Sequence, residues 1–393
     1  MDRPGPAAGA TLVSAPRVLT PDGVLEPGTV ALAGGRIEAV GPGRPPRGPG
    51  HRALRSGALV PGLVDLQVNG GFGVDLNRDG AEAWAELAAR LPATGVTAFL
   101  PTLVSAPWPA LLERLRRGAR VGTGPGPGAA RMLGIHLEGP FLAATRAGAH
   151  DASALLDPTP ERVSALLEAA AGSLAMVTLA PELPGALAAV RALCAAGVVV
   201  SVGHSDASGA QVGAAADAGA RAVTHLFNAQ RGLGHRELGV AGAGLTDPRL
   251  TCGLIADTHH VAPAVLRLTL AVAAGRVALV TDATAAAGMP PGPYRLGGET
   301  VTVAAEGPPR LADGTIAGSA LQLWQAVRTL VRLEVDWAVA VAAASQVPAD
   351  LLGHRDRGRI AAGCVGDLLW LDDDQRPAAT WIAGRQVWGR PGP

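Results

Sequence analysis

The sequence predicts an α/β protein in which residues 60–345 form a (β/α)8 TIM barrel, with a small β-sandwich domain formed by both termini, residues 1–59 and 346–393. Two observations support this prediction. Eight short apolar runs alternate with helical segments through the middle of the chain, whereas the two ends contain short β-like stretches separated by Gly and Pro. An open doubly wound sheet also accommodates eight strands and is the alternative architecture.

Both ends of the chain are β-rich and show no helical period. The predicted strands there are residues 12–18, 29–32, 36–40, 367–372 and 380–388. Two similar ends around a different middle predict one sandwich built from both. The Pro/Gly segment 41–50 is predicted to be a surface loop, because proline lacks the N–H that a strand ladder needs.

The middle of the chain alternates β-runs with helix-runs. The predicted barrel strands are 63–67, 97–100, 133–137, 176–179, 198–202, 222–224, 251–256 and 277–281. Helical spacing between them is clearest in 81–91, 161–171, 187–196 and 207–218. The strands are almost continuously apolar, which is typical of parallel strands buried on both faces.

Composition excludes several classes of protein. With 33 Lys+Arg against 33 Asp+Glu, the chain has no net charge that would favour nucleic acid or an anionic membrane, so a small polar substrate is expected. Cys194, Cys252 and Cys364 lack metal-knuckle spacing and are predicted to be small core residues. The Ala-rich run 337–345 is shorter than the roughly 20 residues that span a bilayer, and no signal-like segment follows the N-terminus, so a cytoplasmic location is expected.

Four of the predicted barrel strands end at residues that can perform chemistry: Glu138, His204, His225 and Asp282. In a (β/α)8 barrel the carboxyl ends of separate strands meet at one mouth. Two imidazoles and one carboxylate are a common ligand set for catalytic zinc, and Asp282 can act as a general base beside them. The alternative for each histidine is a hydrogen-bonded core or loop residue, but their barrel order favours a metal hydrolase.

Local motifs extend this interpretation. They are PGLVDLQVNGG (61–71), HLEGPF (136–141), RAGAH (146–150), GHSD (203–206), THLFNA (224–229), IADTHHV (255–261), VTDA (280–283) and LADGTIAGS (311–319). In order and content they closely resemble the N-acetylglucosamine-6-phosphate deacetylase family of the amidohydrolase superfamily. The resemblance covers nearly the whole chain, including the C-terminal Gly-x-x-x-Asp-Leu and Gly-Arg-x-Val-Trp segments.

The resemblance implies one divalent metal ion per subunit, zinc or iron, on Glu138, His204 and His225. It also implies that Asp282 is the catalytic acid/base, which takes a proton from the attacking water and returns it to the leaving amine. By the same resemblance His260 contacts the acetamide carbonyl and the sugar, and His150 binds the sugar.

The resemblance places the substrate's phosphate as well. Asn228 and Ala229 match the segment that meets the phosphate, and Arg236 matches an arginine that pairs with it, often across a homodimer interface. A guanidinium suits a phosphate because it donates two parallel hydrogen bonds. The motif 311–319 supplies three further substrate-binding residues: Ile316, Ala317 and Gly318.

The chain departs from the superfamily after the first strand, where many members carry His-x-His for a second metal and this chain has Gln67-Val68-Asn69. Amide oxygens are much weaker ligands than imidazole, so the second metal site is predicted to be empty. Some deacetylases of this family share the Gln-x-Asn form. Gln230 replaces the methionine usual after Asn-Ala, and His259 is predicted to have a surface or supporting role because adjacent side chains point apart.

Two other patterns carry no function. The glycine-rich segment 122–128 is predicted to be a linker, since its prolines remove backbone donors. His204, Ser205 and Asp206 are consecutive and cannot form a catalytic triad.

The expected function is hydrolysis of N-acetylglucosamine 6-phosphate to glucosamine 6-phosphate and acetate, with that phosphorylated amino sugar as the small-molecule partner. Two alternatives stay open at this stage. One is a deacetylase of another N-acetyl amino sugar or an N-acyl amino acid, and the other is a catalytically silent amidohydrolase-like binding protein.

Overall fold

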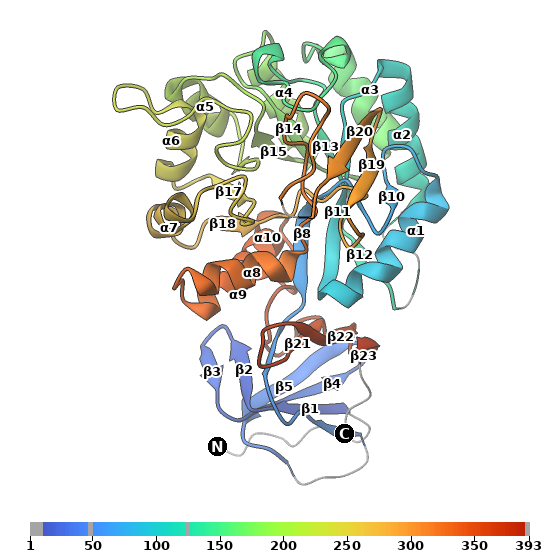
Figure 1. Ribbon diagram of the computed structural model, residues 1–393, viewed down its shortest axis with the longest axis vertical. Helices are drawn as coiled ribbons and strands as arrows, with labels where there is room; N and C mark the ends of the chain where they lie inside the picture. Colours follow the sequence, from blue (N-terminus) through green and yellow to red (C-terminus); the bar gives the residue numbers. More distant parts are fainter. Residues whose placement is uncertain (1–10, 46–49, 123–125, 127, 306, 390–393) are drawn as a thin grey trace.

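The computed structural model describes residues 11–45, 50–122, 126, 128–305 and 307–389. Figure 1 shows a barrel of strands and helices standing on a small β domain, with the first and last described strands of the chain in the lower part. Parts of the predicted loops 41–50 and 122–128 lie outside the described residues. Of the helices in the described ranges, none combines the length and apolar character that crossing a bilayer requires.

The barrel strands are β8 (Leu63–Val68), β11 (Val96–Val104), β13 (Ile135–Glu138), β14 (Leu174–Leu179), β15 (Val199–Val202), β16 (Ala222–Val223), β17 (Thr251–Leu254) and β18 (Val277–Leu279). In that order each strand pairs with the next in parallel, and the short β12 (Arg131–Met132) also pairs with β11. The ends of β8 and β18 meet, because Asp282 N donates to Gln67 O at 3.0 Å and Val68 bridges Ala283. A nearly closed barrel confirms the predicted fold and excludes the open doubly wound sheet.

Ten helices accompany these strands in the described chain: α1 (Ala81–Arg90), α2 (Trp108–Val121), α3 (Pro160–Ala170), α4 (Ala186–Ala195), α5 (Gly209–Asp217), α6 (Gly239–Thr246), α7 (Pro263–Val272), α8 (Leu323–Arg332), α9 (Trp337–Ala343) and α10 (Gln346–Leu351). The four predicted helices correspond to α1, α3, α4 and α5. Local sequence sets their starts: Thr159 caps α3, and Ser208 with Gln211 forms a capping box on α5.

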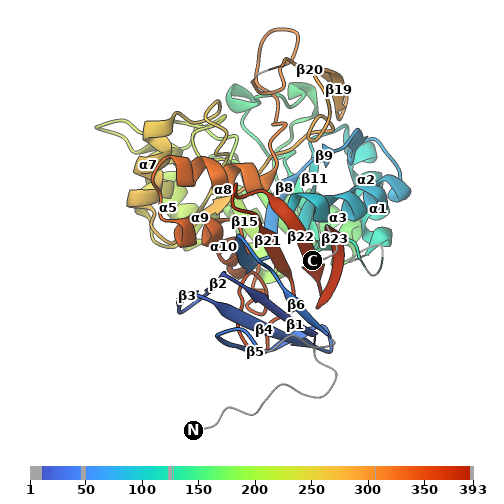
Figure 2. The ribbon, with the colours of Figure 1, turned by 60° about the horizontal axis from the view of Figure 1, so that its bottom comes forward.

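The small domain contains two sheets. One has the order β5-β4-β1-β6, from β5 (Arg36–Pro42), β4 (Gly28–Ala33), β1 (Thr11–Ala15) and β6 (His51–Ala53). The other has the order β23-β22-β21-β7-β2-β3, from β23 (Arg385–Gly389), β22 (Pro377–Ile382), β21 (Leu368–Leu371), β7 (Ala58–Pro61), β2 (Arg17–Thr20) and β3 (Gly23–Leu25). Figure 2 shows the C-terminal strands lying beside the N-terminal ones.

Both sheets of the small domain share one hydrophobic cluster, which includes Val13, Val30, Leu59, Leu368 and Trp381. The prediction that the two termini build this domain together is therefore confirmed. Helix α10 packs instead with the barrel, because its Ala349 and Leu351 join a cluster of inward-facing strand residues. The predicted domain boundaries at residues 59 and 346 stay predictions.

Two predicted terminal strands were wrong in detail. The stretch 12–18 is two strands in different sheets, interrupted at Pro16, which has no N–H to continue a ladder. The stretch 380–388 is a hairpin of β22 and β23 that turns at Ala383 and Gly384, both with positive φ. Pro16 and Gly384 are the local signals of these two breaks, and the prediction extended one strand through each of them.

The segment after β18 contains a hairpin that the sequence pattern missed. It consists of β19 (Gly292–Leu296) and β20 (Glu299–Val303), paired antiparallel. The first barrel strand is followed by a two-stranded sheet of β9 (Gly70–Gly71) and β10 (Val74–Asp75). Asp75 holds the hairpin, because its Oδ2 accepts a hydrogen bond from Gly297 N at 2.8 Å. The hairpin is thereby fixed beside the barrel mouth.

Two glycine-to-alanine substitutions test how the helices pack against the barrel, and their expected effects on the free energy of unfolding differ. A Cβ on Gly118 of α2 would lie 2.6 Å from Trp84 Cη2 and 2.7 Å from Ile135 Cδ1, both buried, so we expect Gly118→Ala to destabilise the protein by about 1–3 kcal/mol. Gly213 of α5 has nothing within 4 Å, so Gly213→Ala is expected to be neutral or to stabilise by up to about 1 kcal/mol. Denaturant unfolding measures both, and equal effects would contradict the packing.

Candidate metal centre

The candidate site is built at the carboxyl ends of four barrel strands. Glu138 is the last residue of β13, and His204, His225 and Asp282 follow β15, β16 and β18 within three residues. The backbone is left-handed at the latter three, with φ of 48°, 26° and 50°. Such conformations are costly for residues other than glycine and persist where the surrounding fold enforces them, so they mark the strand ends as specialised.

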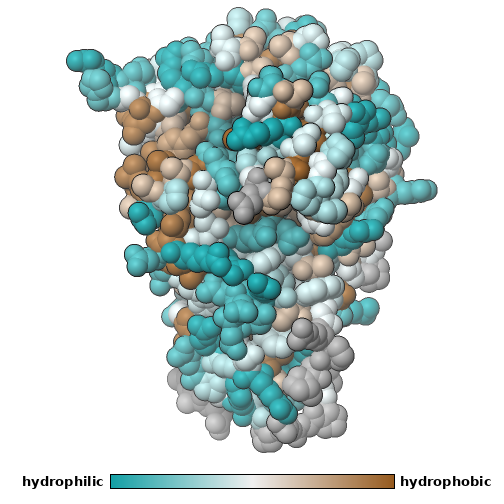
Figure 3. All heavy atoms as spheres, in the orientation of Figure 1, coloured by the Kyte–Doolittle hydropathy of each residue, from teal (hydrophilic) through white to brown (hydrophobic). Residues whose placement is uncertain are grey.

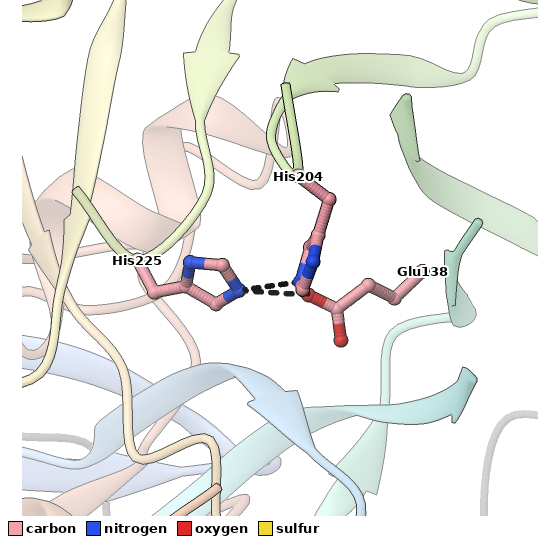
Figure 4. A group of neighbouring side chains, drawn as sticks. All are labelled: Glu138, His204 and His225. Atoms are coloured by element: carbon pink, nitrogen blue, oxygen red, sulfur yellow. Dashed lines mark hydrogen bonds and ion pairs between the residues drawn. The ribbon is translucent and has the colours of Figure 1, made fainter. Parts of the chain in front are cut away.

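Glu138, His204 and His225 converge on one point (Figure 4). Glu138 Oε1 lies 3.2 Å from His204 Nε2 and 2.9 Å from His225 Nε2, and the two Nε2 atoms are 3.1 Å apart. All three side chains are buried. In the described part of the chain, this is the group of His, Cys, Asp and Glu residues arranged to share a metal ion.

The donor chemistry of this group fits a divalent cation. His204 Nδ1 lies 2.9 Å from the carbonyl oxygen of Arg146, which can only accept, so Nδ1 carries the hydrogen and Nε2 presents a bare lone pair. That lone pair faces a carboxylate oxygen and a second imidazole nitrogen. Electron-rich atoms at these distances are favourable around a cation, and imidazole with carboxylate suits zinc or iron.

Electrostatics favours the ionised form of the carboxylate. Burial alone would raise the pKa of Glu138, but the neighbouring imidazoles of His204 and His225 outweigh burial and hold the pKa well below its ordinary value. Glu138 is therefore an anion at neutral pH. Metal ligation requires this state.

A second set of contacts orients His204. The Arg146 guanidinium donates to Asp206 Oδ1 at 2.7 Å, and Arg231 donates to Asp206 Oδ2 at 2.7 Å. These two arginines hold the pKa of Asp206 at about 2. Since Asp206 is two residues from His204 and the Arg146 carbonyl accepts from His204 Nδ1, the contacts form a closed ring that fixes the imidazole.

Asp282 belongs to the same pocket as the three candidate ligands. Its Oδ1 accepts from Asn69 Nδ2 at 2.7 Å and from Gln67 Nε2 at 3.1 Å. Burial first, and the negative charge of Glu138 second, raise the pKa of Asp282 to about 6. A carboxyl group with such a pKa can exchange a proton near neutral pH.

Two further histidines line the pocket, and each has a partner that the sequence interpretation missed. His260 Nδ1 donates to Asp257 Oδ2 at 2.7 Å, and His150 Nδ1 is 2.9 Å from Ser105 Oγ. The Asp-x-x-His spacing of Asp257 and His260 was a local signal that could have revealed the first pair. Ser105 is distant in sequence from His150, so no local signal could have revealed the second.

The pocket has a volume of about 430 Å³. It collects most of the predicted site residues: Glu138, His150, His204, His225, Asn228, Ala229, His260, Asp282, Ile316 and Gly318. Ala317 is instead buried with Leu296 and Val301 of the hairpin. Asn69 also lines the pocket, and both Asn69 and Gln67 contact Asp282. Arg114, Arg146 and Glu299 add charge to the pocket walls.

Arg236 does not reach the pocket within its own chain. It is exposed on the segment between β16 and α6, which projects from the barrel in Figure 1. His259 is also exposed, in agreement with the expected surface position. Gln230 is buried, and its Nε2 donates to the carbonyl of His225 at 3.3 Å.

Comparison with protein families matches residues 58–387 to the amidohydrolase family. N-acetylgalactosamine-6-phosphate deacetylase of Escherichia coli O157:H7 is 39% identical over 377 residues, which cover 95% of this chain and 98% of that protein. N-acetylglucosamine-6-phosphate deacetylase of Danio rerio is 38% identical over 344 residues, which cover 84% of each.

Solved structures give the same result at the level of the fold. The crystal structure of N-acetyl-D-glucosamine-6-phosphate deacetylase from Mycobacterium smegmatis has a TM-score of 0.91 and 39% identity, covering 96% of this chain and 100% of that one. A mutant of that enzyme in complex with N-acetyl-D-glucosamine-6-phosphate has a TM-score of 0.90 and 38% identity, covering 97% and 100%.

The ring of contacts around His204 predicts a role for Asp206 in metal retention. We expect Asp206→Ala to lower metal affinity by about 10- to 100-fold, because the Arg146 carbonyl that orients His204 loses its anchor. Competition with a chelator measures the affinity. The matched control is Asp217→Ala, which removes an exposed carboxylate on α5 that pairs with Arg249. This change should leave metal affinity unchanged. Equal affinities in the two variants would contradict the role of Asp206.

Proposed function

The chain belongs to the amidohydrolase family, and from this premise we propose that it hydrolyses the acetamide of N-acetylglucosamine 6-phosphate, releasing glucosamine 6-phosphate and acetate. The observation that carries the proposal is the convergence of buried Glu138, His204 and His225 in the same pocket as Asp282. The names of the relatives supply the substrate class, N-acetylated amino-sugar 6-phosphates.

In the proposed mechanism Glu138, His204 and His225 hold one divalent metal ion. Such an ion supplies Lewis acidity and lowers the pKa of a bound water toward about 7. Asp282 accepts a proton from the attacking water and later donates it to the nitrogen of the leaving amine. Without the second transfer, the leaving group would be an amide anion, which is too basic to depart.

The remaining pocket residues are proposed to bind and orient the sugar. His260 is held by Asp257 through Nδ1, so its Nε2 is available to meet the acetamide group. His150 lines the same pocket and is proposed to contact the sugar. Asn228 and Ala229 are proposed to meet the phosphate. The segment Ile316 to Gly318 is proposed to bind the sugar, with Ile316 and Gly318 on the pocket wall. The pocket volume of about 430 Å³ lies in the range of small-molecule sites.

A homodimer is part of the proposal, because Arg236 is exposed and outside its own chain's pocket. A partner subunit could bring its own copy of this arginine to the phosphate. Figure 3 shows a mostly hydrophilic face with apolar atoms gathered at one edge, over α7, where Leu268 and Val272 are exposed. Exposed apolar side chains of this kind are common at subunit interfaces.

One observation favours a second candidate substrate, N-acetylgalactosamine 6-phosphate. The E. coli relative that acts on this sugar aligns with 95% of the chain, compared with 84% for the Danio rerio protein. The two sugars differ only in the orientation of one hydroxyl group. Both use the same acetamide and phosphate, so the proposed roles of the residues hold for either.

A substrate panel tests the proposed function. We expect the metal-loaded protein to release acetate from N-acetylglucosamine 6-phosphate with a higher kcat/KM than from N-acetylgalactosamine 6-phosphate, and from both far faster than from the unphosphorylated sugars. The reverse order of the two phosphorylated sugars would assign the second candidate. Acetate release from none of them would exclude both.

Replacing Asp282 separates catalysis from metal binding. Asp282→Asn should keep about one equivalent of metal per subunit but lose several orders of magnitude in kcat, as expected when a shared acid/base is removed. Acetate release measures turnover, and elemental analysis measures the metal. Substantial turnover in this variant would contradict the role of Asp282, and two equivalents in the wild type would contradict a single metal site.

A further inference from the structure

Two amide side chains converge on the carboxylate of Asp282. Asn69 Nδ2 lies 2.7 Å and Gln67 Nε2 lies 3.1 Å from Asp282 Oδ1. Gln67 Nε2 is also 3.1 Å from Glu138 Oε1, so one amide nitrogen bridges the two carboxylates. All four side chains are buried; Gln67, Asn69 and Asp282 lie at the ends of the first and last barrel strands, and Glu138 lies at the end of β13.

Chemistry fixes the orientation of both amides. An ionised carboxylate only accepts hydrogen bonds, so the atoms that face it must be the N–H donors of Gln67 and Asn69. Gln67 uses its two hydrogens, one for each carboxylate. Asn69 Oδ1 is buried without a hydrogen-bond partner among the described residues, so the contact with Asp282 alone orients this side chain.

The backbone holds the three residues in register. Asp282 N donates to Gln67 O at 3.0 Å, and Asn69 N donates to Ala283 O at 2.8 Å. Ser319 N donates to Asp282 O at 2.8 Å and fixes the peptide on the other side. The amides therefore meet Asp282 through a rigid seam, and their contacts do not depend on a flexible loop.

We propose that Gln67 and Asn69 are positioning residues for Asp282, and that they select Oδ2 as the oxygen that carries the proton. Within the described chain two donors occupy Oδ1, and no hydrogen bond is made to Oδ2, on the carboxylate's other side. Hydrogen bonds to the ionised oxygen disfavour its protonation. Oδ2 is thus the available base, and this inference rests on the proposed deacetylase function.

The hydrogen bonds from Gln67 and Asn69 to Oδ1 also keep the transferred proton on Oδ2. When water adds to the acetamide carbonyl, a water O–H bond breaks and an Oδ2–H bond forms. The acid then returns this proton to nitrogen as the C–N bond breaks. Rotation of the protonated carboxyl group would point its O–H at the N–H groups of Gln67 and Asn69, where two donors would face each other. The proton therefore stays on the side of the leaving nitrogen.

Gln67 also affects the ionisation of Asp282, because its amide lies between the carboxylates of Glu138 and Asp282. The charge of Glu138 disfavours ionisation of Asp282, and the bridging N–H groups offset part of that repulsion. The amide hydrogens of Gln67 therefore supply partial positive charge between the two carboxylates.

Asn69→Leu is the sharpest test, because Asn69 contacts Asp282 whereas Gln67 also touches a candidate metal ligand. The change preserves the number and branching of the side-chain heavy atoms and removes the donor. We expect kcat to fall by about 10- to 100-fold, since a buried hydrogen bond to a charged group is lost, with KM changed less than about threefold. Bound metal should stay at the wild-type level, and Asn69→Ser, which keeps a donor, should recover part of kcat.

A double-mutant cycle separates positioning from a general structural defect. In an Asp282→Asn background, Asn69→Leu should cause no further loss of the residual kcat, because the residue through which it acts is already disabled. Losses that multiply would overturn the proposal, as would an unchanged kcat in Asn69→Leu alone. Gln386→Leu, which replaces an exposed amide on β23 of the small domain, is the matched control and should keep the wild-type kcat.

The cycle is run with whichever N-acetyl substrate the wild-type protein hydrolyses, so a wrong sugar assignment appears in the wild type and leaves the cycle interpretable. A crystal structure of Asn69→Leu gives a readout that needs no turnover. The Asp282 carboxylate should be rotated or divided between two orientations. A single, unmoved carboxylate would overturn the proposal even if the protein hydrolysed none of the substrates.

Discussion

The contact between the first and last barrel strands is the constraint on which the site depends. Asp65 on β8 ties this seam together, since its Oδ2 accepts from Thr281 Oγ at 2.7 Å and its Oδ1 accepts from Thr281 N at 3.2 Å. Burial raises the pKa of Asp65 to about 7. Gln67 lies two residues beyond Asp65, and Asp282 lies one residue beyond Thr281. The contacts that close the barrel therefore also place the carboxylate that is proposed to be catalytic.

One part of the barrel interior is a group of buried polar side chains that are joined by hydrogen bonds. His136 Nδ1 lies 3.1 Å from the Leu66 carbonyl and Nε2 lies 2.8 Å from Thr178 Oγ, which continues through Thr224 to Ser201. Because the carbonyl only accepts, the hydrogen is on Nδ1 and the hydroxyls point along the chain in one direction. Burial lowers the pKa of His136 to about 4, so this imidazole carries no charge at neutral pH.

Prediction of the fold succeeded where structure follows local periodicity. The alternation of apolar runs with helical spacing identified all eight barrel strands and four of the helices, because a strand buried on both faces has its own composition. It failed at Pro16 and at the turn of Ala383 and Gly384, where one proline and one Ala-Gly pair mark a change of sheet or direction. It also missed the hairpin β19–β20, whose alternation is interrupted by Gly and Pro and whose position depends on Asp75.

Glu138, His204, His225 and Asp282 could be placed at strand ends from the sequence, because each stands at or just after the end of an apolar run. The contacts of these residues depend on the tertiary structure. The amides of Gln67 and Asn69 contact Asp282 because barrel closure brings together strands that are separated by more than two hundred residues. Hydrophobic periodicity records which face of a strand is buried, whereas a hydrogen bond between strand ends depends on the register that closure imposes.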